Sequence, residues 1–519
     1  MTNDALPKTN LVTDGAGLYF NKSSFDRSLP MRMSARGGEV VPINTAVTNP
    51  KILDISPQSE LLVSSAGGET GNDPFWVVSA GSERRIGDVL GHDAVWAPNG
   101  ALVFVRGDDI YIAEHYGANP RKLATAPGPP FSIKFSPDGS RMTFTIGDPN
   151  KNSTMWEAQA DGSAMRPIFP RPGWNAPPEP CCGKWTPDGK YFVFENGGDI
   201  WIVADLFGRF SEPVQLTSGP LRFHDPLPSK DGKKLFVVGV QPQAQLVRYD
   251  ATSGDFVPFL GGISAGDVDF SRDGQWVTYV TYPDQVLWRS KVDGSERLRL
   301  TSSPMQCALA HWSPDGKQIA FAGWQPGERW KLWLVSKDGG KAQVLTTDNA
   351  AEADPTWSPD GNTLAFVRST QPKGPSIALL DLKTLTRSQL SGSEGLLRPR
   401  WSPDGRYLVA MAGDSNALMI YDFRRRKWRR LASGLGTIGY VAWASDSVYI
   451  YFDSVVRHDS TYLRVKASDG KTEQLANLKN LRRYFGIWGL WSGLAPGAIP
   501  LFTRDTSTQE IYTLDWRLP

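Results

Sequence analysis

The side chains able to do chemistry are few and lie far apart along the chain. Two of the five histidines, His92 and His311, fall near expected first strands, which can line a central channel. Isolated histidines are more often hydrogen-bonded or solvated than metal ligands, and no group of residues has zinc-ligand spacing. The sequence therefore predicts no metal site and no cofactor. The five histidines are His92, His115, His224, His311 and His458.

A serine nucleophile is not evident either. The nearest approach to Gly-x-Ser-x-Gly is Ser391-Gly-Ser-Glu-Gly395, which lacks the first glycine. A nucleophile elbow needs a strand, a turn and a helix, and no helical pattern follows this segment. The chain also has no Gly-rich loop of the P-loop type. These observations predict a protein that is not an enzyme and has no catalytic residues.

Three cysteines, Cys181, Cys182 and Cys307, are too few for a disulfide framework. Free cysteines are commonly buried, so we expect reduced and mostly buried thiols. A strained disulfide between Cys181 and Cys182 is the alternative, although adjacent residues rarely meet disulfide geometry.

A run of positive charge stands out where a hairpin between a third and a fourth strand is expected. The favoured interpretation is a solvated hairpin. The alternative is a patch that binds an anionic partner, with Trp428 available for stacking. The patch residues are Arg424, Arg425, Arg426, Lys427, Arg429 and Arg430.

The elements that must position these side chains repeat along the whole chain. His311-Trp-Ser-Pro-Asp-Gly316 shows the pattern: an apolar residue ends one strand, a tight Ser-Pro-Asp-Gly turn follows, and a second apolar strand begins. Twelve such turns recur at intervals of 39 to 51 residues. We expect their aspartates to hold the turn by accepting backbone hydrogen bonds rather than to bind a ligand. The clearest of these residues are Asp138, Asp188, Asp231, Asp273, Asp315, Asp360 and Asp404.

The repeat predicts an all-β chain built as tandem β-propellers. About twelve units of this length are typical of four-stranded blades, and one ring usually holds four to eight. Second strands such as Tyr191–Phe194 and Leu235–Val238 are apolar on both faces. Blades stacked between neighbours bury both faces, so this pattern favours propellers over a sandwich.

The division between the rings is predicted from connection lengths. Asp205–Ser211 is the longest third-to-fourth-strand connection, which suggests a first propeller of about five blades over 1–211 and a second of about seven over 212–519. The alternative is six plus six, with a boundary near 253. In the first scheme Glu212–Thr217 closes the second ring. No equivalent strand precedes Leu11, so we expect the first ring to lack its closing strand and the natural protein to begin upstream of Met1.

Charge and targeting signals are uninformative about partners. The formal net charge is +2, from 56 basic and 54 acidic residues, which predicts no global attraction to nucleic acid or membranes. The N-terminus has no secretory signal and no run of about 18 apolar residues occurs. We expect a cytoplasmic protein without membrane insertion, or a periplasmic one if the chain starts upstream.

The Trp-Ser-Pro-Asp-Gly units resemble the TolB-like propeller repeat, a relative of WD repeats, over nearly the entire chain. Longer phrases, such as Cys181–Phe194 and Asp505–Trp516, resemble the sensor part of bacterial CadC-like regulators, in which a winged-helix DNA-binding domain precedes the propellers. That domain is absent here, so DNA binding is expected only through a domain outside this chain. The resemblance implies a non-enzymatic scaffold that recognises a protein partner or a small ligand. A propeller-channel enzyme, hydrolase or lyase, or a periplasmic TolB-like interaction protein is the alternative.

Overall fold

Nearly all regular structure in the computed structural model is β-strand. Two short 3-10 turns, η1 (His115–Gly117) and η2 (Leu260–Gly262), are the helical elements among the residues that it describes. No described helix has the length and apolar character needed to cross a membrane. The described residues are 1–24, 27–65, 72–79, 82–147, 153–169, 179–206, 208–370, 373–456 and 459–516.

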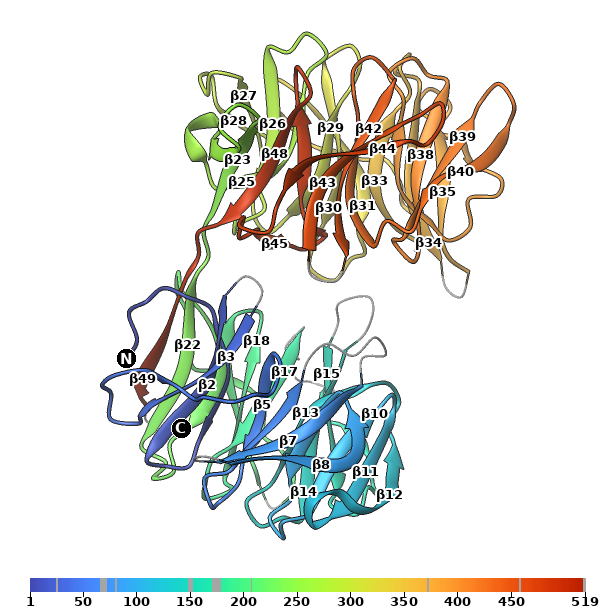
Figure 1. Cartoon of the computed structure of the whole chain (residues 1–519). Helices are drawn as coiled ribbons and strands as arrows, with labels where there is room; N and C mark the ends of the chain where they lie inside the picture. The colour runs from blue at the N-terminus through green and yellow to red at the C-terminus, as the bar shows by residue number, and fades with distance from the viewer. Residues whose placement is uncertain are drawn as a thin grey trace. The chain divides into compact units, whose positions relative to one another are not determined.

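The chain divides into two β-propellers, each built from six antiparallel sheets (Figure 1). The first propeller is Met1–Pro242 with Ser507–Pro519, and the second is Gln243–Thr506. The prediction of an all-β chain of tandem propellers with about twelve blades is confirmed. In ten of the twelve blade sheets, each strand pairs with the strand that precedes it in the sequence.

In the first propeller, five sheets consist of four strands that follow one another in sequence. The sixth has three strands, two of them consecutive and one from the C-terminal end of the chain. The strands are β1 Lys8–Thr13, β2 Gly17–Ser24, β3 Arg27–Ser34 and β4 Val41–Pro42; β5 Pro50–Ile55, β6 Leu61–Ser65, β7 Asp73–Ser79 and β8 Ser82–Gly91; β9 Asp93–Trp96, β10 Leu102–Arg106, β11 Asp109–Glu114 and β12 Ala118–Thr125; β13 Pro130–Phe135, β14 Arg141–Gly147, β15 Ser153–Gln159 and β16 Arg166–Pro167; β17 Pro180–Trp185, β18 Tyr191–Asn196, β19 Asp199–Ala204 and β20 Val214–Gln215; and β21 Arg222–Pro228, β22 Lys234–Gln241 and β49 Thr508–Asp515.

In the second propeller, all six sheets have four strands, and a small hairpin lies between the last two blades in sequence. The strands are β25 Ala265–Phe270, β26 Trp276–Thr281, β27 Leu287–Lys291 and β28 Leu298–Arg299; β29 Gln306–Trp312, β30 Gln318–Trp324, β31 Lys331–Ser336 and β32 Gln343–Val344; β33 Ala351–Trp357, β34 Thr363–Thr370, β35 Gly374–Asp381 and β36 Arg387–Gln389; β37 Leu396–Trp401, β38 Tyr407–Ala412, β39 Ala417–Asp422 and β40 Lys427–Ser433; β41 Thr437–Trp443, β42 Tyr449–Val456, β43 Asp459–Lys466 and β44 Thr472–Asn477; β47 Ser492–Ala495, β48 Ile499–Asp505, β23 Ala244–Asp250 and β24 Asp255–Pro258; and the hairpin β45 Phe485–Gly486 and β46 Gly489–Leu490.

The sixth and the twelfth repeats exchange their outer strands. β22 pairs along its whole length with β49, from Lys234 opposite Asp515 to Gln241 opposite Thr508. Reciprocally, β23 pairs with β48, which begins and ends in the twelfth repeat. The chain therefore passes between the propellers twice, at the short links that follow β22 and β48.

The predicted division at 211 is wrong, and so is the predicted role of Glu212–Thr217. Asp205 and Phe210 form a bridge within a wide turn, and the strand after it, β20, pairs with β19. This long connection therefore joins two strands of one sheet, the fifth of the first propeller, and does not lead to the second propeller. The alternative boundary near 253 is also displaced, because Ala251–Gly254 is the turn between β23 and β24, while the chain changes propeller after Pro242.

The first propeller also has a closing strand that the sequence did not reveal. β49 is the third strand of its sixth sheet, and Met1 and Thr2 bind to β49. The Met1 amino group donates to the Ile511 carbonyl at 2.7 Å, and Ile511 N donates to the side-chain oxygen Oγ1 of Thr2 at 2.9 Å. The expectation that the first ring lacks its closing strand is therefore wrong, and the sheet around Asp188 also has its outer strand, β20.

The repeated turn is held by the side chains that define it. In the turn at Asp315, Ser313 Oγ donates to Oδ1 of Asp315 at 2.6 Å, and Lys317 N donates to the same oxygen at 3.1 Å. The same two bonds recur in all seven turns singled out in the sequence: at Asp138, Asp188, Asp231, Asp273, Asp315, Asp360 and Asp404.

The core lies between neighbouring sheets. Second strands are buried on both faces, as Leu235–Val238 illustrates with four residues exposed by 2 % or less. One layer joins the sheet of β9–β12 to that of β13–β16 through Val103, Ile110, Ile133 and Phe144. This stacking holds each inner strand at a fixed position around the propeller axis.

Candidate active site

The six inner strands of the second propeller surround an axial funnel of about 660 Å³. Its walls come from β25, β29, β33, β37, β41 and β47 and from the turns that follow them. A volume of this size accommodates a small organic ligand. Since every blade contributes to its wall, the funnel lies on the axis of the ring.

Two positions in each repeat of the second propeller supply the polar and charged side chains of the funnel. Five of the inner strands carry an irregularity in their pairing, and in four of them a residue with positive φ occupies it: Asp267 at 47°, Leu309 at 55°, Asp354 at 60° and Arg398 at 51°. Bulges of this kind re-aim a side chain. The residue two positions later faces the funnel. Six residues before each turn residue stand Asp267, Leu309, Asp354, Arg398, Tyr440 and Trp491; four before stand Asp269, His311, Thr356, Arg400, Ala442 and Gly493.

Asp269 and His311 form a pair on adjacent inner strands. Oδ2 of Asp269 lies 3.6 Å from Nδ1 of His311 and accepts a hydrogen bond from Trp312 N at 2.7 Å. The backbone bond fixes the carboxylate beside the imidazole. Nε2 of His311 is buried and has no hydrogen-bond partner within the described structure. One ring nitrogen of this funnel-lining residue therefore has an unused hydrogen-bonding capacity.

Asp267 lies deeper in the same funnel. It is 6 % exposed, and its Oδ2 accepts a hydrogen bond from Leu309 N at 3.2 Å. Its Oδ1 is buried and has no partner in the part of the chain that the structure describes. Burial raises the pKa of Asp267 to about 6, against the lowering effects of Leu309 N, Arg398 and His311. A carboxyl with this pKa is protonated in an appreciable fraction of molecules near neutral pH.

The floor of the funnel holds a buried cluster of opposite charges. Nη1 of Arg400 donates to Oδ1 of Asp354 at 2.5 Å, and Nη1 of Arg398 lies 3.9 Å from the other oxygen. The Arg398 guanidinium also stacks 4.0 Å from the centre of the Tyr440 ring. Burial raises the pKa of the Tyr440 hydroxyl, with Asp267 adding to the effect. This phenol therefore stays neutral and can donate a hydrogen bond.

The inner end of the funnel is covered by the β45–β46 hairpin. The carbonyl of Trp488 accepts a hydrogen bond from Nη2 of Arg398 at 2.7 Å, and its indole meets Trp330 edge-on with ring centres 5.3 Å apart. Asp267, Tyr440 and Trp488 line a second, much smaller hollow behind the funnel. The hairpin thus closes the small hollow that lies behind the charged floor of the funnel.

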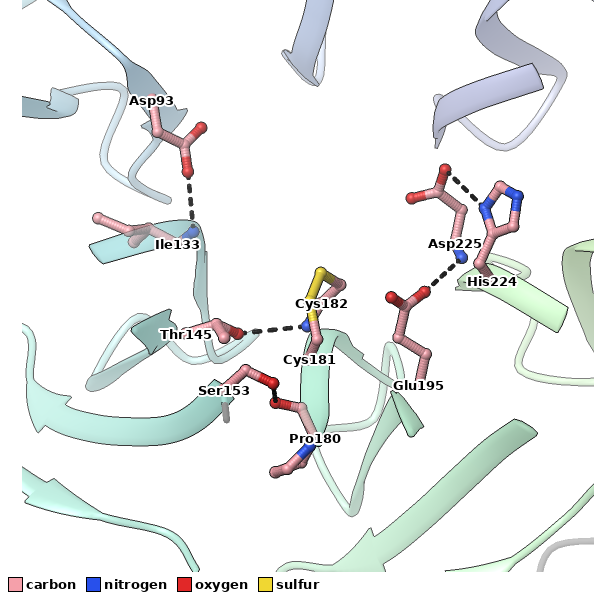
Figure 2. Close-up of a disulfide and its surroundings, with 10 residues drawn as sticks. All are labelled: Asp93, Ile133, Thr145, Ser153, Pro180, Cys181, Cys182, Glu195, His224 and Asp225. Atoms are coloured by element: carbon pink, nitrogen blue, oxygen red, sulfur yellow. Dashed lines mark hydrogen bonds and ion pairs between the residues drawn. A yellow bond between two sulfur atoms is a disulfide. The ribbon is translucent and has the colours of Figure 1, made fainter. Parts of the chain in front are cut away.

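The first propeller holds a different cluster, around a disulfide between Cys181 and Cys182 (Figure 2). The expectation of reduced thiols at these positions is therefore wrong, whereas Cys307 is free and buried as expected. The inner-strand pairing of β17 is irregular between Cys181 and Lys184, and Cys182 has φ of 59°. The irregularity lets the two adjacent side chains turn to the same side.

Acidic and basic groups face this disulfide from the neighbouring strands. Oε2 of Glu195 accepts a hydrogen bond from Asp225 N at 3.2 Å, and Oδ2 of Asp225 lies 3.4 Å from Nδ1 of His224 (Figure 2). Burial raises the pKa of Glu195 to about 7, and the Asp225 charge adds to it. Burial lowers the pKa of Lys184 to about 8, although Asp225 opposes the change.

The remaining residues predicted from sequence lie outside both clusters. Arg424, Arg425, Arg426, Lys427 and Arg430 are exposed on the β39–β40 hairpin, while Arg429 donates to the Ala467 carbonyl. The hairpin packs through Trp428, whose indole N–H donates to Ser391 O at 3.0 Å, so this ring is engaged in the fold. His92 contacts the Pro130 carbonyl at 2.9 Å, and His458 falls outside the described residues.

Sequence reasoning missed most of the funnel residues. It noted His311 beside a first strand but not Asp267, Asp269, Arg398 or Tyr440. The signal was present, because these residues stand at fixed distances from the repeated turns. An alignment of the repeats would have shown that these residues occupy two equivalent positions, six and four residues before each turn residue.

Comparison with known proteins agrees with this architecture. Residues 327–483 match the TolB beta propeller domain, PD40. A 200-residue segment is 24% identical to the uncharacterized peptidase YuxL of Bacillus subtilis strain 168, and covers 36% of this chain and 28% of that protein. A 199-residue segment is 29% identical to the uncharacterized protein Atu1656 of Agrobacterium fabrum strain C58, and covers 29% of this chain and 68% of that one.

Two solved structures extend the comparison at low identity. Putative TolB from Agrobacterium tumefaciens is 16% identical with a TM-score of 0.41, over 51% of this chain and 98% of that one. Puromycin hydrolase is 16% identical with a TM-score of 0.32, over 72% of this chain and 57% of that one.

These matches correct two expectations. The prediction that the chain is not an enzyme is contradicted by its similarity to a protein named as a peptidase, although the chain spans little more than a quarter of that relative. None of these proteins is named as a transcriptional regulator, so the CadC-like resemblance has no support beyond the sequence phrases that suggested it. The supported part of the resemblance is the TolB beta propeller domain over residues 327–483.

Proposed function

We propose that the second propeller is a channel enzyme, a hydrolase or lyase, that performs acid–base chemistry in its axial funnel. The observation that carries the proposal is that Oδ1 of Asp267 and Nε2 of His311, on two residues that line the funnel, are buried polar atoms with no hydrogen-bond partner in the described structure. Buried polar atoms are normally hydrogen-bonded, so two such atoms without partners on residues of one funnel wall indicate where ligand atoms could bind after a small side-chain movement.

The two groups suit opposite roles. Asp269 lies beside Nδ1 of His311 and leaves Nε2 as the ring atom that would take a proton from water or from a carbon acid. Asp267, with its pKa of about 6, can be protonated and give its proton to a leaving group. Separate environments that push two titratable groups toward opposite roles are the usual arrangement of general acid–base catalysis.

The charged floor would orient the substrate. Arg398 and Arg400 are both bound to Asp354, so they offer a polar but balanced surface rather than a strongly cationic one. Tyr440 adds a neutral hydrogen-bond donor. Such a floor fits a polar, uncharged or weakly charged group better than a polyanion.

A substrate panel tests this proposal. Chromogenic esters, glycosides and peptide amides, together with uronides whose elimination creates an absorbing double bond, would be offered to the full chain. We expect turnover of one class, and a loss of about 10²-fold or more in kcat for Asp267→Asn and for His311→Gln, the scale of general acid–base contributions.

Two controls separate chemistry from folding. His92→Gln lies in the first propeller and Asp338→Asn on an exposed hairpin, so both should keep full turnover. Activity that survives both Asp267→Asn and His311→Gln would refute the assignment of the funnel, and so would the absence of turnover and of any ligand-induced change in Trp fluorescence across the panel.

A further inference from the structure

We propose that reduction of the Cys181–Cys182 disulfide converts the cluster in the first propeller into a Zn²⁺ site. The ligands are the two thiolates and the Glu195 carboxylate. This site lies in a different propeller from the funnel and does not depend on the function proposed for it.

Geometry brings the three side chains to one point. A ligand atom of Cys181, of Cys182 and of Glu195 lies within 4.8 Å of each of the other two. Bonds of about 2.3 Å to sulfur and about 2.0–2.2 Å to carboxylate oxygen place the ligand atoms of one Zn²⁺ roughly 3.5 Å apart. In the oxidised chain the two sulfurs are bonded to each other, so they must move apart after reduction to bind one Zn²⁺, and the Glu195 carboxylate already lies close enough to need only side-chain rotation.

The surrounding strands fix these residues before any metal arrives. The amide of Cys182 donates to Thr145 Oγ1 at 3.2 Å, which ties β17 to the neighbouring sheet (Figure 2). Oε2 of Glu195 is held by the amide of Asp225 at 3.2 Å. No cation reaches Glu195 within ion-pair distance in the described part of the chain, so its carboxylate is free to bind a metal.

Charge balance favours a divalent ion in the reduced state. Lys134 and Lys184 bring positive charge to this region, and Asp54, Asp225 and Glu195 bring negative charge. Reduction and deprotonation add two thiolates, and one Zn²⁺ neutralises both. The site therefore takes up the cation without a change in the net charge of the cluster, which limits the cost of placing it beside two lysines.

The chemistry balances with a dithiol as reductant. A dithiol such as dithiothreitol transfers two electrons and two protons to the disulfide and becomes a cyclic disulfide, leaving two thiols on the protein. Binding of Zn²⁺ then forms two Zn–S bonds and releases two protons. Both cysteines are partly exposed, so reductant and metal have access to them. Three protein ligands leave the fourth position of a tetrahedral ion open to water or to a ligand, the composition of catalytic rather than structural zinc sites.

The test measures Zn²⁺ affinity of the full chain by competition with a chromophoric chelator, after oxidation and after reduction with removal of the dithiol. We expect one Zn²⁺ per reduced chain and none per oxidised chain. Co²⁺ in place of Zn²⁺ should give sulfur-to-cobalt charge-transfer bands in the reduced protein alone.

Variants identify the ligands. Cys181→Ser and Cys182→Ser should abolish the charge-transfer bands, and Glu195→Gln should weaken binding by roughly tenfold or more, the scale of losses around metal sites. Glu328→Gln, an exposed acid in the second propeller, and Cys307→Ser should bind as wild type does. Thermal unfolding of each variant shows that it is folded.

Equal binding by oxidised and reduced chains would overturn the proposal, as would binding that is unchanged in Glu195→Gln. Failure of the reduced wild-type chain to bind Zn²⁺ would overturn it too, because that chain needs no substitution to be tested.

Discussion

The carboxylate of Asp453 accepts a hydrogen bond from Nη1 of Arg483 at 2.7 Å, and the two side chains are 2 % and 1 % exposed. Arg483 also donates to the carbonyls of Leu490 and Trp491, and Asp453 accepts from Ser492 Oγ at 2.6 Å. The pair thus joins β42 to both ends of the segment that covers the inner end of the funnel.

Removing one partner of this buried pair should be costly. We expect Asp453→Ala to lower the free energy of unfolding by about 3–5 kcal/mol, because it leaves the Arg483 charge buried without its counter-ion. Urea unfolding followed by Trp fluorescence measures the loss. Asp459→Ala, an exposed aspartate at the start of β43, is the matched control and should change stability little. A loss at Asp453 no larger than the control's would contradict a structural role for the pair.

The repeated turn predicts a smaller effect. Asp360 is exposed, and its Oδ1 accepts hydrogen bonds from Ser358 Oγ at 2.5 Å and from Asn362 N at 3.1 Å. Asp360→Ala should cost about 1 kcal/mol, the net contribution of such bonds, and should leave ligand binding unchanged. Asp338→Ala, on an exposed hairpin, should cost nothing measurable. Lost ligand binding without lost stability would mean that these aspartates contact a ligand instead.

The proposed acid predicts a pH dependence with a definite sign. Burial raises the pKa of Asp267 to about 6, from the ordinary value of 3.8, so the protonated form is lost as pH rises through about 6. Turnover should therefore decline above this pH. The same shift stabilises the folded chain at low pH and loses that contribution between about 3.8 and 6 as pH rises.

Profiles of kcat against pH for wild type and Asp267→Asn would check this prediction. The amide cannot titrate, so the decline near pH 6 should be missing from whatever activity the variant retains. An unchanged decline in the variant would assign the titration to another group.

The basic hairpin predicts salt-sensitive binding of polyanions. Arg424, Arg425 and Arg426 are exposed, and no acidic side chain pairs with them in the described structure. If the hairpin is an anion-binding patch, retention on heparin should fall steeply with salt through counter-ion release, and replacing these three arginines by glutamine should reduce it. The control is a second triple variant, in which Lys337, Lys341 and Lys383 of the same propeller are replaced by glutamine, because it removes the same amount of charge from other sites. Equal losses from both triple variants would leave only a solvated hairpin.

The local pattern of the sequence predicts the strands and turns but not their exchange. Ser-Pro-Asp-Gly turns and doubly apolar second strands reflect contacts within a few residues, so blades can be counted directly. The link Gln241–Ala244 reads like any turn between second and third strands, although its strands belong to different propellers. The local sequence of the link does not show that its two strands pair with strands hundreds of residues away.

Only part of the candidate site could be predicted from the sequence, for a related reason. His311 and Asp267 stand at positions that recur relative to the turns, so their approach to the axis follows from the repeat. Whether their polar atoms find partners depends on which residues the neighbouring blades contribute, and that is fixed only when the ring closes. The pairing of Cys181 with Cys182 likewise depends on an irregular strand, which propensity does not reveal.

The strand exchange predicts that the two propellers differ in their ability to fold as separate fragments. All six sheets of the second propeller consist of strands within 243–506, whereas the first propeller takes β49 from the far end of the chain. Without β49, the edge of β22 is unpaired, and Lys8 loses its contacts with Glu510, at 3.4 Å, and with the Gln509 carbonyl, at 2.7 Å. Unpaired edges of this length promote aggregation.

We therefore expect fragment 243–506 to unfold cooperatively by itself, with the transition that the second propeller shows in the full chain. Fragment 1–242 should be unfolded or aggregated. Supplying residues 507–516 through a flexible linker should restore its cooperative unfolding, and a scrambled version of that segment should not. Cooperative unfolding of 1–242 alone, or a disordered 243–506, would show that the exchanged strands do not decide where each propeller becomes stable.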